Sequence, residues 1–221
     1  MNRILTLLIS LIFIASSCRS LHKTTPSDFV PQDYVIYEKL FGDLNNDGQE
    51  DCLLIVKGTN ESNNVVNQFD KKVDRNRRGI IVLFKKENGY QMIVKNDNCF
   101  YSENEDGGNY YAPQLSIEIK KGDLIIHFEH GRYGLWNYTF RLLHAEFKLI
   151  KYEASSNFGP VVNEETHINF LTKEKLIKEN INEDDEGNDE VFKSTISSIK
   201  INNLIKLSEI EYFEGLDMSM Y

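Results

Sequence analysis

The 221-residue sequence has little proline, cysteine and tryptophan: four, three and one, respectively. So few prolines exclude a proline-rich, low-complexity chain. The sequence also lacks an apolar run that could span a membrane as a helix. Its longest, Ile4–Ala15, has twelve residues, whereas a span needs about twenty. The remaining composition, 41% hydrophobic and 27% charged, is that of one globular domain of ordinary core size.

Positive charge is also scarce. The chain carries 25 lysines and arginines against 34 aspartates and glutamates, a formal net charge of -9. Such an acidic surface repels the phosphate backbone of nucleic acids and attracts divalent cations. We therefore predict no nucleic-acid partner.

Familiar catalytic patterns are absent from the sequence as well. It contains no G-x-S-x-G nucleophile elbow, no P-loop, no dinucleotide fingerprint and no Cys/His nucleophile signature. A pair of carboxylates for glycoside hydrolysis can be chosen from 34 acids almost at will, so acidic residues alone indicate little. The sequence favours a protein without catalytic activity.

The first eighteen residues indicate export. Arg3 precedes the apolar stretch Ile4–Ala15, and the small residues Ala15–Ser17 lead directly to Cys18. This pattern resembles the lipobox of bacterial lipoproteins, although Ala15 stands where leucine is usual, so a plain secretory signal is the alternative. The resemblance implies that residues 1–17 are a signal peptide and that Cys18 carries the lipid. It places the protein in a bacterial cell envelope, periplasmic or surface-facing.

The segment after the lipobox is rich in serine, threonine and proline. We interpret residues 18–32 as a lipidated tether, since this composition is typical of linkers. Residues 33–221 then form a single β-rich domain.

Residues 43–51 have the pattern of a calcium loop. Calcium prefers several hard oxygen ligands on a tightly wrapped backbone, and Gly48 permits the turn. The predicted ligands, at loop positions 1, 3, 5, 7 and 9, are Asp43, Asn45, Asp47, Gln49 through its carbonyl, and Asp51. Position 12 is Leu54 and not glutamate, so the loop is not an EF-hand.

This loop, with Phe41-Gly42 before it and an apolar strand after it, resembles the FG-GAP/VCBS type of repeat over Phe41–Val56. The resemblance implies a structural calcium ion. Family members carry several copies and build a propeller, but one copy is present here and the length excludes seven blades. The alternative is an Asx-rich turn without a metal.

The rest of the chain predicts strands. The unbroken apolar run of Asp51–Lys57 indicates a strand buried on both faces. Segments of alternating polarity joined by short turns predict an antiparallel meander over Leu124–Tyr152. Residues Glu190–Ile199 have apolar residues near a helical spacing, which predicts a helix there. We predict a mainly β fold, an antiparallel meander with a sandwich-like or partial-propeller sheet, and one short C-terminal helix.

Two cysteines remain after Cys18. Cys52 and Cys99 are 47 residues apart, a separation at which a disulfide would stabilise the fold in an oxidising compartment. Both flank apolar segments, so two buried free thiols are the alternative.

Two segments are candidates for a ligand surface. The basic cluster Lys71–Arg78 could receive an anion through its arginines, although a solvated connection that pairs with acidic loops is the simpler interpretation. The turn His130–Gly134 would present an arginine and a tyrosine outward, and Trp136 on the next strand is interpreted as core. The surface residues so predicted are Arg75, Arg77, Arg78, Arg132 and Tyr133.

These observations predict a membrane-anchored envelope lipoprotein with a structural calcium site and a binding or structural role. Its partners would be the membrane, through the lipid, and a glycan or an envelope protein. The alternative is a carbohydrate-binding module or a glycan-processing enzyme that uses loop carboxylates.

Overall fold

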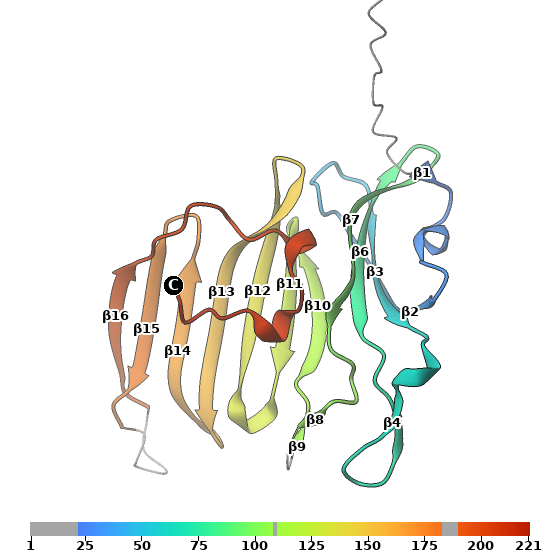
Figure 1. Cartoon of the computed structure of the whole chain (residues 1–221). Helices are drawn as coiled ribbons and strands as arrows, with labels where there is room; N and C mark the ends of the chain where they lie inside the picture. Colours follow the sequence, from blue (N-terminus) through green and yellow to red (C-terminus); the bar gives the residue numbers. More distant parts are fainter. Residues whose placement is uncertain (1–21, 108–109, 183–189) are drawn as a thin grey trace, which may run out of the picture.

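The computed structural model describes residues 22–107, 110–182 and 190–221, so the predicted signal peptide and Cys18 lie outside the described residues. Two main sheets make up the fold, with the chain's C-terminal segment crossing the face of the larger one (Figure 1). Every strand pair is antiparallel. The predicted mainly β, antiparallel fold is confirmed. No helix among the described residues is long and apolar enough to cross a membrane.

The smaller sheet has five strands in the order β1-β7-β6-β3-β2. Its strands are β1 (His22–Lys23), β2 (Tyr34–Gly42), β3 (Asp51–Gly58), β6 (Arg78–Lys86) and β7 (Gly89–Phe100). Two short hairpins lie outside it: β4 (Asn64–Val66) with β5 (Lys72–Asp74), and β8 (Asp106–Gly107) with β9 (Tyr110–Tyr111).

The larger sheet has seven strands in sequence order, so the predicted meander is confirmed and continues to the edge of the sheet. Its strands are β10 (Gln114–Lys120), β11 (Asp123–Glu129), β12 (Gly134–Leu143), β13 (Glu146–Phe158), β14 (Val161–Asn169), β15 (Glu174–Asn180) and β16 (Phe192–Ser198). The helical turns are all short 3-10 segments: η1 (Pro26–Phe29), η2 (Glu61–Asn63), η3 (Gly131–Tyr133), η4 (Leu207–Glu209) and η5 (Phe213–Gly215).

The prediction of a helix over Glu190–Ile199 is wrong. Residues 192–198 form β16, which pairs with β15 through Leu176 and Ile196, among others. β16 lies at the edge of the sheet, and its residues are exposed on both faces after the first one; Ile196, for example, is 72% exposed. The side chains of β16 therefore do not alternate between core and solvent. Without that alternation the apolar spacing does not distinguish strand from helix.

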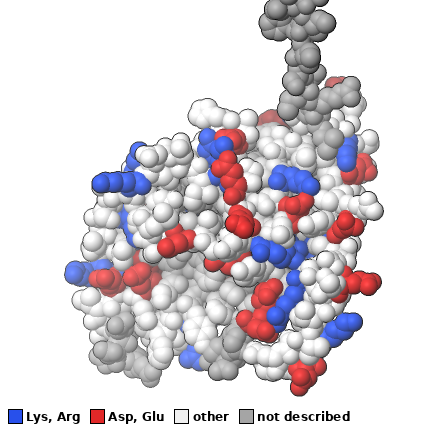
Figure 2. Space-filling view, viewed as in Figure 1, with Lys and Arg blue, Asp and Glu red and all other residues white. Residues whose placement is uncertain are grey.

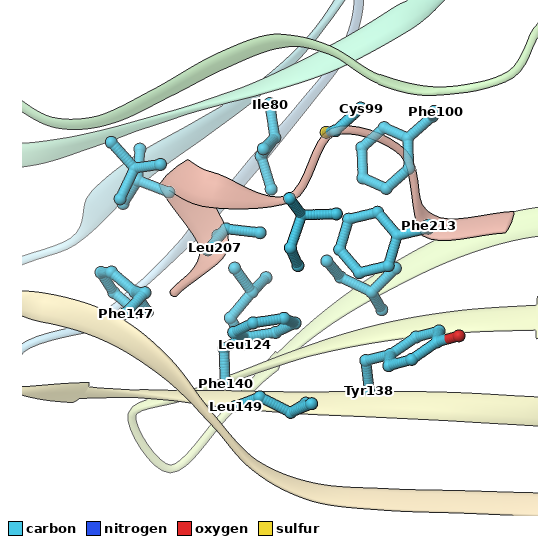
Figure 3. Packing of buried hydrophobic residues seen from close by; sticks show 14 of the residues in the cluster. Ile80, Cys99, Phe100, Leu124, Tyr138, Phe140, Phe147, Leu149, Leu207 and Phe213 are labelled. Carbon is cyan, nitrogen blue, oxygen red and sulfur yellow. The ribbon is translucent and has the colours of Figure 1, made fainter. Parts of the chain in front are cut away.

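One hydrophobic cluster joins the two sheets. Ile80 and Phe100 enter it from the five-stranded sheet, and Leu124 and Phe140 enter it from the seven-stranded sheet. Phe213 lies between them (Figure 3). The C-terminal segment supplies further members of this cluster: Ile199, Leu207, Ile210 and Met218. The two sheets therefore share a core that the C-terminal segment completes.

The outer face of the five-stranded sheet has its own cover. Strand β3 is buried along residues 51–57, as predicted, because Leu54 and Val56 pack on this outer side against Phe29. Phe29 is 4% exposed, and β1 pairs with β7 just before it. The predicted tether over 18–32 is therefore wrong from residue 22 onward: an apolar sheet face needs a cover, and this segment provides it.

Of the two alternatives for Cys52 and Cys99, the structure has the buried free thiols and not the disulfide. Cys52 and Cys99 are both free and buried, and they lie in clusters on opposite faces of the five-stranded sheet. Side chains on opposite faces of one sheet point away from each other and cannot be bridged. Burial raises the pKa of the Cys52 thiol to about 11 and raises the pKa of Cys99 further.

Candidate functional site

A row of cross-strand neighbours forms the floor of a groove on the inner face of the seven-stranded sheet. The register pairs Trp136 with Ala154, Ala154 with Thr166, and Thr166 with Ile177, across β12, β13, β14 and β15. Residues directly opposite each other in a sheet point to the same face, so the four side chains stand in one line. The small Ala154 leaves a hollow between Trp136 and Thr166.

The C-terminal segment and the η3 turn provide the walls. Residues Leu216–Ser219 line one side of the groove, and Tyr133 lines it from the η3 turn. The groove is open to solvent on one side and has a volume of about 420 Å³, within the ~300–1,000 Å³ range of small-molecule sites. Gly134 permits the sharp entry into β12: its φ is 123°, and a Cβ there would lie 1.9 Å from the Ser155 carbonyl oxygen.

Three charged residues line the groove, Glu164, Lys175 and Asp217, and each makes a hydrogen bond. The Thr166 hydroxyl donates to Glu164 at 3.0 Å, and the Lys175 ammonium donates to a backbone oxygen of Tyr221 at 2.7 Å. Asp217 accepts from the hydroxyl and the backbone N–H of Ser219, and these hydrogen bonds hold the pKa of its carboxyl below the usual range. The groove therefore presents both donors and acceptors, and each of its charged groups makes a hydrogen bond.

Trp136 joins the groove to the core. Its indole stacks on Phe128 with ring centroids 5.6 Å apart and the planes 15° from parallel. The interpretation of this face of β12 as core is confirmed, since Tyr138 is 3% and Phe140 0% exposed and Trp136 packs against the same cluster. Trp136 itself is only half-buried and also lines the groove.

The ligand surface predicted from the sequence is divided in the structure. Tyr133 lines the groove, whereas Arg132 beside it is exposed and does not line it. The arginines of the basic cluster do not line the groove, and Arg78 lines a second cavity of about 290 Å³. The structure therefore does not gather the five predicted residues into one site.

The basic cluster holds neighbouring segments together. Arg78 is 5% exposed and donates to the Tyr101 carbonyl at 3.0 Å, and Arg75 pairs with Asp106 at 2.5 Å. The Arg77 guanidinium lies over the rings of Tyr101 and Tyr212, 5.0 and 5.7 Å from their centroids. The expected pairing with an acidic loop is present, and the arginines are packed against the protein, whereas Lys71 and Lys72 are exposed to solvent.

The second cavity contains one carboxyl group with a raised pKa. Glu214 is an exposed residue, but its carboxylate accepts from the Tyr101 backbone N–H at 3.1 Å, and desolvation of the carboxyl group raises its pKa. This bond fastens the C-terminal turn to residue 101. A raised pKa in a cavity also suits a catalytic acid, but the hydrogen bond to the backbone gives Glu214 a structural role.

The raised pKa of Glu214 predicts that its contribution to the stability of the fold depends on pH. Because its pKa is raised on folding, the folded state binds more protons than the unfolded state just above the ordinary glutamate pKa. The contribution of Glu214 to the free energy of unfolding should therefore fall as the pH rises above the ordinary glutamate pKa of about 4.3. Glu214→Gln should reduce that fall, as measured by denaturant unfolding at a series of pH values. Exposed Glu211 gives the control Glu211→Gln; an equal effect of both substitutions would contradict this assignment.

The predicted calcium loop joins β2 to β3 and is closed by its own side chains. Asp43 accepts from the backbone N–H groups of Asp47 and Gly48 at 3.1 and 2.8 Å. Asn45 accepts from Asp47 N–H at 2.8 Å, and its amide donates to the Asp47 carboxylate at 3.0 Å. Gly48 has a φ of 82°, which glycine adopts without strain. The loop thus brings Asp43, Asn45 and Asp47 together.

Asp51 has a different position in the loop. It is fully buried, and its two oxygens accept from the backbone N–H groups of Leu44 and Lys85 at 3.0 and 2.8 Å. Burial is the main cause that raises its pKa, and the charges of Asp47 and Asp43 raise it further. Asp51 therefore fastens the loop to β6, while Leu44, which is also fully buried, fixes it in the core.

The loop's donors suit calcium. All are hard oxygens, the two Asp43 oxygens each keep a lone pair after one hydrogen bond, and a cation would offset the repulsion among three carboxylates. Within the described residues, however, no three His, Cys, Asp or Glu side chains form a group that could hold a metal by themselves. A calcium ion would therefore need oxygens of Asn45 and of the Gln49 backbone besides those of Asp43 and Asp47.

The charges on one face of the protein are mixed. On the face drawn in Figure 2, lysines and arginines are interspersed with aspartates and glutamates, without a wide area of positive charge.

A comparison with models of protein families, curated proteins and solved structures finds no match.

Proposed function

We propose that this chain is a lipid-anchored, non-catalytic protein of a bacterial cell envelope. Its β-rich domain would bind a ligand in the groove above Trp136, Ala154, Thr166 and Ile177, and calcium would stabilise the Asp43–Asp51 loop. The groove is the observation that carries the binding role, because it combines an aromatic wall, a small-residue hollow and hydrogen-bonded polar groups in one concave surface.

The chemistry of the groove supports binding rather than turnover. A general acid at neutral pH needs a raised carboxyl pKa, whereas hydrogen bonds from Ser219 lower the pKa of Asp217. The two carboxyl groups in the described residues with raised pKa values, Asp51 and Glu214, both accept from backbone N–H groups outside the groove. This favours a binding protein over the glycan-processing enzyme.

The lipid anchor is supported by the lipobox-like sequence ending at Cys18. In a bacterial host that lipidates exported proteins, the wild-type chain should sediment with membranes and be released by detergent. Cys18→Ala removes the acyl acceptor and should move nearly all of the protein to the soluble fraction. Immunoblotting of the two fractions measures this.

Ser17→Ala is the matched control, because it keeps the cysteine and a small residue before it. This variant should remain with the membranes. Membrane association that persists in Cys18→Ala would contradict the proposed anchor.

A further inference from the structure

We propose that the groove over β12–β15 binds a neutral saccharide through its Trp136 wall and Ala154 hollow. This inference rests on the proposed binding function and names the ligand class for that site. It places carbohydrate recognition on the inner face of the sheet, and not on the exposed turn with Arg132.

The aromatic wall favours a flat ligand with aliphatic C–H groups. Trp136 is held in orientation by its stack on Phe128, and Tyr133 and Tyr152 line the same groove. The negative face of an aromatic ring attracts the weakly positive C–H groups of a ligand stacked on it. A sugar ring presents such groups on its faces.

The polar groups favour hydroxyls. A sugar hydroxyl can donate to Glu164 or to Thr166, which both line the groove, because the Thr166 oxygen keeps lone pairs while its own hydrogen donates to Glu164. A purely apolar ligand would remove water from these groups without replacing their hydrogen bonds, which is costly.

The charges in the groove disfavour an anionic ligand. Lys175 is the cationic residue that lines the groove, and its ammonium already donates to Tyr221. Glu164 and Asp217 line the same groove and add negative charge that a phosphate or carboxylate would have to approach. A neutral ligand avoids both costs.

The chain's only tryptophan lies in the groove, so its fluorescence reports occupancy directly. The full-length lipoprotein in detergent would be titrated with linear tetrasaccharides of glucose, mannose, xylose and N-acetylglucosamine. At least one should change the fluorescence saturably. Ala154→Leu fills the hollow and should weaken that binding at least tenfold, and Thr166→Val, which keeps the side-chain shape, should weaken it several-fold.

Ser116→Leu is the control, because residue 116 is exposed on β10, away from the groove; it should bind as the wild type does. Circular dichroism of each variant would establish that it folds. No fluorescence change with any of the four saccharides would overturn the inference, as would an equal response in folded Ala154→Leu and wild type.

Failure of the saccharide assignment is distinguishable from failure of the proposed function. A neutral peptide that binds in the same assay, with loss in Ala154→Leu, would overturn the saccharide class and support the binding role of the groove. Membrane association that persists in Cys18→Ala would contradict the anchored lipoprotein instead, whatever the saccharide titration gives.

Discussion

Replacing Phe213 with alanine is expected to lower the free energy of unfolding by about 3–5 kcal/mol, the usual cost of removing a fully buried phenylalanine. Phe213 is 1% exposed and stacks on Phe100 at 5.0 Å, and it meets the ring of Tyr138 edge-on at 5.1 Å. These rings belong to the five-stranded and seven-stranded sheets, so the cavity would open where the C-terminal turn connects them. Denaturant unfolding measures the loss.

Phe158→Ala is the matched control, because the Phe158 side chain is 67% exposed at the end of β13. Its effect should be within about 0.5 kcal/mol, as is usual for surface positions. Equal destabilisation by both substitutions would mean that the turn at Phe213 does not connect the two sheets.

Phe213→Ala should also loosen the groove wall. Residues Leu216–Ser219 follow the turn directly, so their amide hydrogens should exchange faster in the variant than in the wild type. Strands β12 and β13 have their own ladder hydrogen bonds and should keep more of their protection. Hydrogen exchange read by mass spectrometry would show the difference between the wall and the floor.

Calcium is expected to raise the melting temperature of the wild-type protein by about 5–10 °C at roughly a hundredfold excess over the dissociation constant. The ion would offset the repulsion among Asp43, Asp47 and Asp51, whose charges lie close enough for the first two to raise the pKa of the third. Asp47→Ala removes a central ligand and should abolish the calcium-dependent rise. Thermal melts with calcium and with EDTA measure it.

Glu50→Ala is the control within the same loop. Glu50 is exposed and stands outside the alternating ligand positions, so the variant loses the same charge as Asp47→Ala but keeps every predicted ligand. It should retain most of the calcium-dependent rise. Loss of the rise in Glu50→Ala as well would indicate that net charge, and not ligation, determines the response.

The sequence was most informative where burial is strong on both faces of a strand. The apolar run of β3 correctly predicted two buried faces, but it could not show which segment covers the outer one. Residues 22–32 have the composition of a linker, and their role depends on a single buried side chain, Phe29, and a two-residue strand. The composition of the whole segment is dominated by its polar residues and prolines. It therefore indicates a tether and does not reveal the contact made by one side chain.

The groove could be predicted only in part. Alternation correctly placed Trp136 with the core side of β12, but its neighbours Ala154 and Thr166 come from other strands through the register. Register depends on the turns and on bulges, such as the shift after Ser156, which the sequence pattern does not specify. The wall formed by Leu216–Ser219 arises from tertiary contacts of a segment without regular structure.

The proposal that calcium stabilises the Asp43–Asp51 loop is tested most directly by isothermal titration of the calcium-free protein with calcium chloride. We predict binding of one ion per chain in the wild type and in Glu50→Ala, and none in Asp47→Ala. A wild-type protein that binds no calcium would contradict the proposal, and the loop would then be an Asx-rich turn closed by its own hydrogen bonds.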